Sequence, residues 1–132
     1  RQRQMCIRDR FITKDNKVIV NELAPRPHNS GHYTIEACSF DQFDAHIRGI
    51  AGWPLEQPQL LKPAVMVNVL GQHVAPTRAL IADHPEWNVH DYCKAEVRHD
   101  RKMGHITVLT DDTAKTVADL EATGCWDDLK KA

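Results

Sequence analysis

One stretch, Val18–His32, constrains what this chain can fold into more than any other. Its first residues, Val18–Val20, are apolar on both faces of an extended chain, which predicts a strand in a covered sheet. An amide and a carboxylate, Asn21 and Glu22, end this strand. Because a core strand does not need such an ending, we interpret it as a strand that delivers a metal-binding carboxylate.

A loop rich in proline and in polar side chains follows the strand. Pro25 and Pro27 favour extended conformations in the residues before them, so Arg26 and His28 are expected to point to the same side. Gly31 allows the backbone to turn or to approach a ligand closely. The polar side chains of the loop are Arg26, His28, Asn29, Ser30 and His32. A guanidinium, imidazoles and an amide gathered in this way indicate an anion-binding loop.

The composition excludes several classes of protein. A length of 132 residues suits one domain or two small lobes, and the net charge of −1 draws the chain neither to nucleic acid nor to a membrane. No apolar run is long enough for a transmembrane helix and no signal peptide is visible, so we expect a cytoplasmic protein. The four cysteines are scattered without a Cys-x-x-Cys pair, which favours reduced thiols over a disulfide framework.

The amino-terminal half predicts a hairpin and a helix. Residues 1–10 lack periodicity, and we interpret them as a leader that is not native to the protein, with a native disordered arm as the alternative. Lys14–Lys17 is the turn of the hairpin. Ser39 and Gln42 have the spacing of a capping box, and the helix that they begin is expected to end at Gly52. The apolar residues at helical spacing, expected to pack in the core, are Phe40, Phe43, Ile47 and Ile50.

The second half predicts a small β-rich lobe after a linker over 54–63, a segment that contains three prolines. Ala64–Leu70 is a buried strand, and Val89–Val97 and Lys102–Leu109 form a second hairpin. Thr113–Thr123 is a final helix. Its expected cap and inward residues are Asp112, Val117 and Leu120. The fold class is therefore α/β (α+β), with parts over 11–53 and 64–132.

The polar loop also carries a resemblance to a known family. Asn21–His32 resembles the signature of the 5-(carboxyamino)imidazole ribonucleotide synthases, which are ATP-grasp ligases of bacterial and fungal purine synthesis. The similarity covers roughly Phe11 to the end and continues through Ser39–Arg48, Val67–Gly71, Tyr92–Lys94 and Arg101–His105. The resemblance implies the carboxyl-terminal part of such an enzyme, namely the end of an ATP-grasp domain followed by a small mixed β lobe with a terminal helix.

The resemblance implies ATP and Mg²⁺ as cofactors and assigns two groups of residues in the loop region. Asn21 and Glu22 would meet the nucleotide, and Glu22 would also be a ligand of the magnesium ion. Arg26, His28 and Asn29 would surround bicarbonate or carboxyphosphate as catalytic residues. Preorganised donors suit such an anion, because they stabilise its charge without reorganisation.

A third implied group would bind the substrate, 5-aminoimidazole ribonucleotide. Lys94 and Arg101 lie on opposite sides of the second predicted hairpin turn, so both can face one phosphate or carboxylate group. The family usually has proline-glycine where this chain has His99 and Asp100, and Asp100 places a negative charge beside Arg101. By position, Asp9 falls near a second metal-binding glutamate of the family.

The implied reaction couples ATP cleavage to carboxylation of the exocyclic amine of 5-aminoimidazole ribonucleotide, with bicarbonate activated as carboxyphosphate. The implied partners are these small molecules and, in the full-length enzyme, a second copy of the chain. We expect no turnover from this chain alone, because the adenine pocket and the phosphate-covering glycine loop are missing. Two alternatives stay open, another ATP-grasp carboxylase or formyl-transferring relative, and a non-catalytic anion-binding or assembly module.

Overall fold

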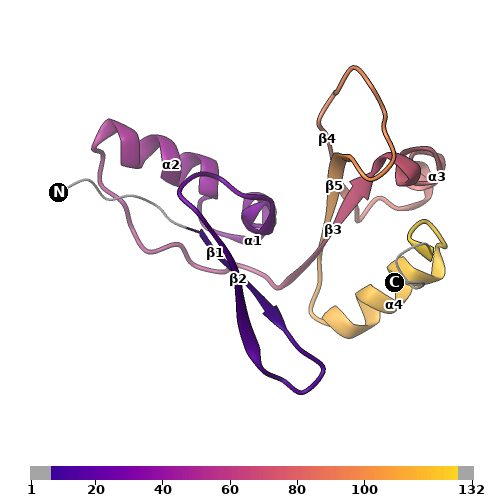
Figure 1. Cartoon of the computed structure of the whole chain (residues 1–132), viewed down its shortest axis with the longest axis horizontal. Coiled ribbons are helices and arrows are strands. Elements are labelled where there is room, and N and C mark those ends of the chain that lie inside the picture. The colour runs from indigo at the N-terminus through magenta and orange to yellow at the C-terminus, as the bar shows by residue number, and fades with distance from the viewer. Residues whose placement is uncertain (1–6, 128–132) are drawn as a thin grey trace. The chain divides into compact units, whose positions relative to one another are not determined.

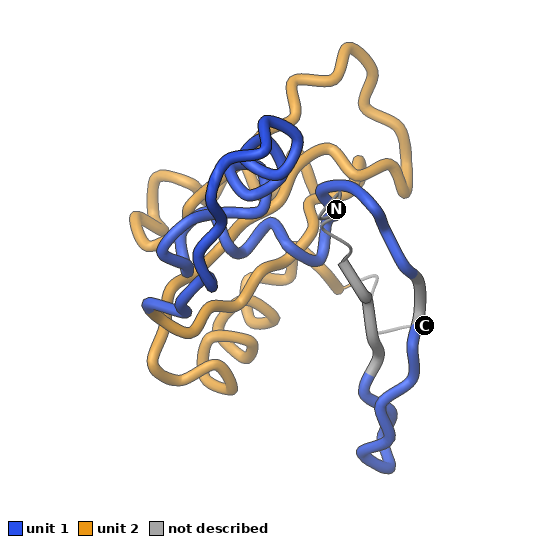
Figure 2. The backbone as a smooth tube through the Cα atoms, turned by 90° about the vertical axis from the view of Figure 1, so that its left-hand side faces the viewer, with its two compact units in different colours: residues 1–61 blue, residues 62–132 orange. Residues whose placement is uncertain are grey.

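The structure, a computed structural model, describes residues 7–127, with side chains for 12–20 and 23–127. The chain divides into two compact units (Figure 2), an amino-terminal unit over residues 1–61 and a carboxyl-terminal unit over residues 62–132. The order of helices and strands along each unit can be followed in Figure 1. Both units mix helices with antiparallel strands, which confirms the predicted fold class.

The amino-terminal unit begins with the predicted hairpin. Strands β1 (Ile7–Ile12) and β2 (Val18–Ala24) pair antiparallel around a turn in which Asn16 adopts a positive φ of 58°. Asparagine tolerates this conformation better than most residues, so the turn chemistry was readable from the sequence. Strand β1 begins at Ile7, inside the segment 1–10, so the end of that segment pairs with β2.

Helix α2 (Gln42–Ala51) is present, but its amino-terminal cap differs from the predicted one. Asp41 is the N-cap, and its carboxylate accepts hydrogen bonds from the backbone N–H groups of Phe43 and Asp44 at 2.7 and 2.9 Å. The Ser39 hydroxyl instead accepts from the N–H of Gln59. A charged acceptor two residues closer to the helix interacts better with its free N–H groups and its dipole. Gly52 ends the helix at a φ of 70°, as predicted.

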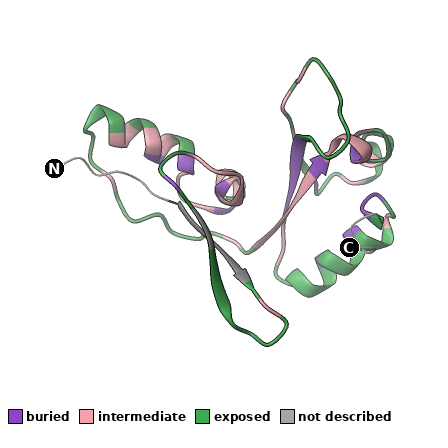
Figure 3. Ribbon diagram, viewed as in Figure 1, coloured by how far each residue is buried: buried purple, intermediate pink, exposed green. Residues whose placement is uncertain are grey.

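The apolar face of α2 does not pack in a core. Phe43, Ile47 and Ile50 are 42%, 59% and 73% exposed, whereas Gln42 and Ala45 are buried. Figure 3 shows exposed residues along this helix. The apolar residues Val18–Val20 of strand β2 are exposed as well. The periodicity therefore predicted the helix and the strand correctly. The prediction that their apolar residues are buried was wrong, because the described part of this unit pairs only two strands and provides no second layer over them.

The carboxyl-terminal unit is built on an antiparallel sheet in the order β3-β5-β4. Its strands are β3 (Ala64–Leu70), β4 (Asn88–Asp91) and β5 (Lys102–Leu109). Central strand β5 is buried on both faces along most of its length, and Ile106 is completely inaccessible. The core around it is formed by Val69, Trp87, Ile106, Val108, Leu120, Cys125 and Trp126.

Short helices complete this unit. The segment after β3 contains η2 (Gly71–His73), α3 (Val74–Leu80) and η3 (Ile81–Asp83). Asp112 caps α4 (Thr113–Ala122) as predicted, since its carboxylate accepts from the N–H of Lys115. Of the two residues expected to face inward, Leu120 is buried, but Val117 is exposed, and Thr116 is buried in its place.

Two further features concern the chain as a whole. Within the described residues, no helix is long and apolar enough to span a bilayer. Three of the four cysteines lie in the described part and are free thiols, namely Cys38, Cys93 and Cys125. Burial raises the pKa of the Cys38 thiol.

Candidate functional site

The polar loop after β2 forms the short 3₁₀ helix η1 (Asn29–Gly31), for which His28 is the N-cap. The Nδ1 atom of His28 accepts from the backbone N–H of Ser30 at 3.3 Å and lies 2.9 Å from the Ser30 hydroxyl. A ring nitrogen that accepts from an N–H carries no proton of its own, so the proton of the neutral ring is on Nε2. Ser30 therefore supports the loop and places the ring proton of His28 on Nε2.

The buried side chain of Gln42 anchors this loop to helix α2. Its Oε1 accepts from the backbone N–H of His28 at 2.8 Å, and its Nε2 donates to the His28 carbonyl at 2.9 Å. The same Nε2 lies 2.6 Å from Nδ1 of His32. The His32 ring also stacks on Phe43 at a centroid distance of 5.5 Å, so His32 helps to hold the loop against α2.

The remaining predicted catalytic residues border the same loop. Arg26 is exposed, and its guanidinium donates to the carbonyl of Pro27 at 3.0 Å. This single local bond uses one of five N–H donors, so the guanidinium can still meet an anion. Asn29 is the first residue of η1 and half-buried. The structure thus places Arg26, His28 and Asn29 on one short loop.

The predicted nucleotide and metal ligands Asn21 and Glu22 have side chains outside the described residues. Their backbone positions are defined. Glu22 pairs with Asp9 in the register of the hairpin, and Arg10 pairs with Val20, which leaves Asn21 in a β-bulge. Bulges are over-represented beside active sites. Among described side chains, no group of three potential ligands gathers to hold a metal ion.

In the carboxyl-terminal unit, the second hairpin differs from its prediction. Strand β4 ends at Asp91 and does not continue to Val97. Cys93 adopts a positive φ of 50°, which interrupts an extended strand, and its N–H is bonded to the Asp91 carboxylate at 2.8 Å. The turn at Arg98–Arg101 is present, with Asp100 at a φ of 58°. A loop over 92–101 therefore replaces the ladder that was expected.

Lys94 lies in this loop against strand β5. Its Nζ donates to the main-chain carbonyl of Lys102 at 2.5 Å and lies 5.5 Å from the centroid of the Tyr92 ring. The Tyr92 hydroxyl is 2.9 Å from Nδ1 of buried His105, and that ring stacks on His90 at 4.4 Å. The Tyr92 ring, on which the Lys94 ammonium group lies, is therefore itself held by contacts with His105 and, through it, His90.

Arg101 lies seven residues after Lys94 in the sequence, and its side chain donates to a different backbone carbonyl. Its guanidinium donates to the carbonyl of Glu96 at 3.2 Å. The neighbouring Asp100 carboxylate accepts from Gln72 at 3.0 Å and lies 3.1 Å from the His99 ring. Asp100 thus has partners other than Arg101, which reduces the expected competition between that carboxylate and an anionic ligand.

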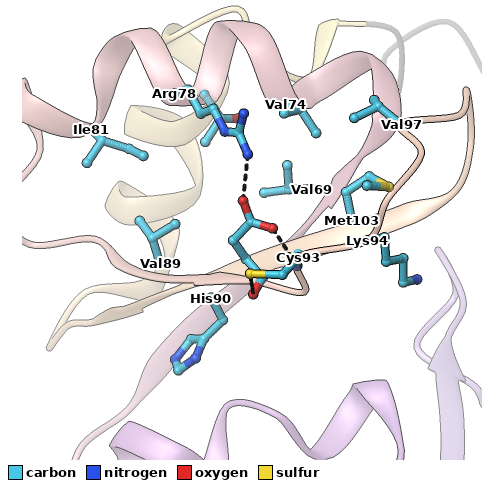
Figure 4. A pocket seen from close by; sticks show the side chains of 13 residues that line it. Val69, Val74, Arg78, Ile81, Val89, His90, Cys93, Lys94, Val97 and Met103 are labelled. Carbon is cyan, nitrogen blue, oxygen red and sulfur yellow. Dashed lines mark hydrogen bonds and ion pairs between the residues drawn. The ribbon is translucent and has the colours of Figure 1, made fainter.

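A cavity of about 320 Å³ lies between α3, β4 and the loop over 92–101 (Figure 4). An ion pair between Arg78 and Asp91 crosses it at 2.7 Å, and this hydrogen bond lowers the pKa of the Asp91 carboxyl. Most of the remaining lining is apolar, including Val69, Val89 and Met103. His90 and Lys94 also line the cavity, and their side chains point away from Arg78 and α3 in Figure 4.

Two groups of supporting residues were not predicted from the sequence pattern. Gln42 was assigned to a capping box, although its side chain bonds a loop fourteen residues earlier in the chain. Tyr92 and His105 were noticed only as part of the resemblance. Nothing in the sequence pattern indicates that Nδ1 of His105 meets the Tyr92 hydroxyl.

Comparison with protein families confirms the resemblance. Residues 9–43 match the ATP-grasp domain, and residues 64–119 match the phosphoribosylaminoimidazole carboxylase C-terminal domain. Similar curated proteins include the N5-carboxyaminoimidazole ribonucleotide synthases of Staphylococcus saprophyticus, 55% identical over 107 residues, and of Staphylococcus aureus, 51% identical over 113 residues. These matches cover 80% and 85% of this chain but only 28% and 30% of the two relatives.

Solved structures agree with this relationship. The N5-carboxyaminoimidazole synthetase of Staphylococcus aureus complexed with ADP has a TM-score of 0.80 at 50% identity, over 86% of this chain and 31% of that one. The Aspergillus clavatus synthase in complex with ADP and 5-aminoimidazole ribonucleotide has a TM-score of 0.72 at 33% identity, over 86% of this chain and 32% of that one. The chain therefore spans about a third of the length of the proteins it resembles.

Proposed function

We propose that this chain, a relative of the N5-carboxyaminoimidazole ribonucleotide synthases, supplies the anion-binding loop and the substrate-phosphate lobe of such an ATP-dependent ligase. The complete enzyme would transfer the carboxyl group of bicarbonate to the exocyclic amine of 5-aminoimidazole ribonucleotide in purine synthesis. Phosphorylation of bicarbonate by ATP would give carboxyphosphate, and attack by the amine would release phosphate. The enzyme would work in the cytoplasm as a homodimer.

The observation that carries the proposal is the preorganisation of the loop over residues 26–32. Bicarbonate is a poor electrophile, because its carbon is electron-rich and hydroxide is a bad leaving group. Its activated form is a small anion that needs fixed donors. The N–H of Ser30 occupies Nδ1 of His28, so Nε2–H can donate, and the guanidinium of Arg26 supplies a planar fork. Each charge-assisted hydrogen bond contributes roughly 1.5–3 kcal/mol.

Lys94 is the residue best placed to bind the substrate phosphate. One of its three protons is used by the carbonyl of Lys102, which fixes the position of the ammonium group without neutralising it. Arg101 would add a guanidinium at the end of the same loop. The engagement of Asp100 by Gln72 supports that role, since it turns one carboxylate oxygen toward a neutral amide.

The nucleotide would require a divalent cation to offset the charge of its phosphates. Asp9 and Glu22 are paired positions of the hairpin, and their carboxylates are the hard oxygen donors that Mg²⁺ prefers. We assign Glu22, with Asp9 as a second candidate, to the metal and Asn21 to the nucleotide. Magnesium, when bound, would screen the phosphates and polarise the transferred group.

A chimeric enzyme tests the proposal. The matching segment of the Staphylococcus aureus relative is replaced by this chain, and ADP release is measured with and without bicarbonate and 5-aminoimidazole ribonucleotide. We expect release that depends on both, and about a hundredfold lower kcat/KM in Arg26→Met, the usual effect of removing one oxyanion donor. The matched control is Arg48→Met, since Arg48 forms an ion pair with Asp44 on α2 at 2.8 Å.

Two outcomes would contradict the proposal. One is ADP release that ignores bicarbonate, and the other is an Arg26→Met variant that behaves like Arg48→Met. Calorimetry with the separate chain covers the alternative of a non-catalytic module, which would bind phosphate or bicarbonate by itself while the chimera stays inactive.

A further inference from the structure

The amide group of Gln42 has only one orientation that satisfies its contacts. A backbone N–H can only donate, so the Gln42 atom 2.8 Å from the N–H of His28 must be the carbonyl oxygen. The NH₂ group then faces the His28 carbonyl at 2.9 Å and Nδ1 of His32 at 2.6 Å. Both backbone polar groups of His28, the N–H and the carbonyl, are thus bonded to the side chain of Gln42, a residue that is only 5% exposed.

This orientation determines the protonation of the neighbouring ring. An NH₂ group offers only protons, so Nδ1 of His32 must accept, and the proton of the neutral ring is on Nε2. The stack of that ring on Phe43, the second residue of α2, keeps Nδ1 directed at Gln42. The tautomer of His32 is therefore a consequence of the amide at position 42.

A second connection ties the far end of the loop to the same residue. The backbone N–H of Gln42 donates to the Thr34 hydroxyl at 3.1 Å, and that hydroxyl donates to the carbonyl of Gly31 at 2.6 Å. The first residue of α2 thus bonds the beginning of the loop over 28–31 directly and its end through the Thr34 hydroxyl.

We propose that Gln42 is the positioning residue of the anion-binding loop. Its side chain fixes the backbone from which the His28 ring projects and selects the Nε2–H tautomer of His32. The inference deepens the proposed function, because the orientation of His28 matters only if that ring meets an anion. Gln42 itself does not touch the reacting groups and acts through His28 and His32.

Two substitutions separate the accepting and donating parts of this role. Gln42→Glu retains an oxygen for the N–H of His28 but replaces the donor with a second acceptor. Gln42→Ala removes both. The 132-residue chain is labelled with nitrogen-15, and NMR reports the protonation of the His32 ring and the hydrogen exchange of the His28 amide, relative to the amides of α2. The matched control is Gln57→Glu, the same change at an exposed glutamine of the same unit.

The two variants should respond differently. In Gln42→Glu, Nδ1 of His32 becomes protonated while the His28 amide keeps its protection. In Gln42→Ala, the His28 amide exchanges about tenfold faster, as expected for the loss of one hydrogen bond. Gln57→Glu changes neither signal. A residue that only fills space would give no change of His32 protonation in the isosteric Glu variant.

The inference is overturned if His32 keeps its Nε2–H tautomer in Gln42→Glu, or if the His28 amide of a folded Gln42→Ala chain exchanges as in the original. Should Gln42→Ala unfold the unit, the amides of α2 lose protection together with His28, and the His32 signal of Gln42→Glu decides alone. These measurements need no nucleotide. A negative result here therefore leaves the ligase proposal intact, and an inactive chimera leaves the positioning result intact.

Discussion

The ammonium group of Lys94 lies 2.5 Å from the main-chain carbonyl of Lys102, beyond the point where the pairing of strands β4 and β5 ends. The last backbone bond between the two sides of this region joins the N–H of Tyr92 to the carbonyl of Met103. Beyond it, the side chain of Lys94 takes the place of a ladder hydrogen bond. The same group that is proposed to meet a phosphate therefore also ties its own loop to the sheet.

A first prediction concerns this double role. Lys94→Met keeps the apolar stem over Tyr92 but removes the donor to Lys102. Amides over 95–101 should exchange roughly five to ten times faster, the equivalent of about one hydrogen bond, while those of β5 stay protected. Hydrogen exchange with mass spectrometry measures both. Lys115→Met is the control, because the ammonium group of that lysine is exposed on α4 and bonds only the carboxylate of Asp119. Equal exchange in the two variants would contradict the role of Lys94.

The cap of α2 gives a second prediction. Asp41→Ala should lower the free energy of unfolding by about 1 kcal/mol, because the N–H groups of Phe43 and Asp44 lose their acceptor. Ser39→Ala removes a hydroxyl that bonds only Gln59 and should leave the helix content unchanged. Far-UV circular dichroism during urea unfolding compares them. A larger loss in Ser39→Ala would mean that the cap lies where the sequence pattern put it.

Local chemistry explains which parts of the fold could be predicted. The turn with Asn16, the stop at Gly52 and the cap at Asp112 depend on residues within one turn of the chain, and all three are present. The end of β4 at Asp91 could not be predicted in this way. It depends on the positive φ of Cys93, and cysteine is not a residue type that indicates a turn.

The site followed the same division. The loop that contains Arg26 and His28 was recognisable because its polar residues are consecutive. Gln42 was not, since its contacts reach a loop that is distant in sequence and its spacing from Ser39 matched a familiar capping pattern. The burial of α2 was also misjudged. Periodicity shows which face is apolar, but the layer that would cover Ile47 has to come from elsewhere in the structure.

Close backbone packing between β4 and β5 gives a third prediction. A Cβ atom added at Gly104 would collide with the carbonyl of His90, which is fixed in the sheet. Gly104→Ala should therefore lose about 2–3 kcal/mol of stability, as overpacked core positions do. Gly52→Ala meets no atom within 4 Å and suffers only from its positive φ, so about 1 kcal/mol is expected. Thermal unfolding of the two variants checks the order, and a smaller loss at Gly104 would show that the strands can separate freely.

The ion pair between Arg78 and Asp91 predicts how stability changes in acid. The guanidinium lowers the pKa of the Asp91 carboxyl in the folded chain, and the N–H of Cys93 acts in the same direction. A group whose folded pKa is depressed stabilises the fold above its unfolded pKa, about 3.9, and loses that contribution as the pH falls through the lower folded value. Both side chains are substantially exposed, so the contribution at neutral pH is at most about 1 kcal/mol.

Arg78→Met isolates this contribution. The variant should raise the pKa of Asp91 toward its ordinary value, and its deficit in unfolding free energy at neutral pH should shrink as the solution is acidified below the folded pKa. Carboxyl NMR titration of Asp91 and urea unfolding at several pH values measure the two effects. The control is Lys115→Met, in which a different exposed ion pair, the one with Asp119, is broken and the titration of Asp91 should stay as it was. If the deficit of Arg78→Met instead persists unchanged in acid, the arginine stabilises the unit through the packing of its stem on the apolar cavity wall and not through the charge of Asp91.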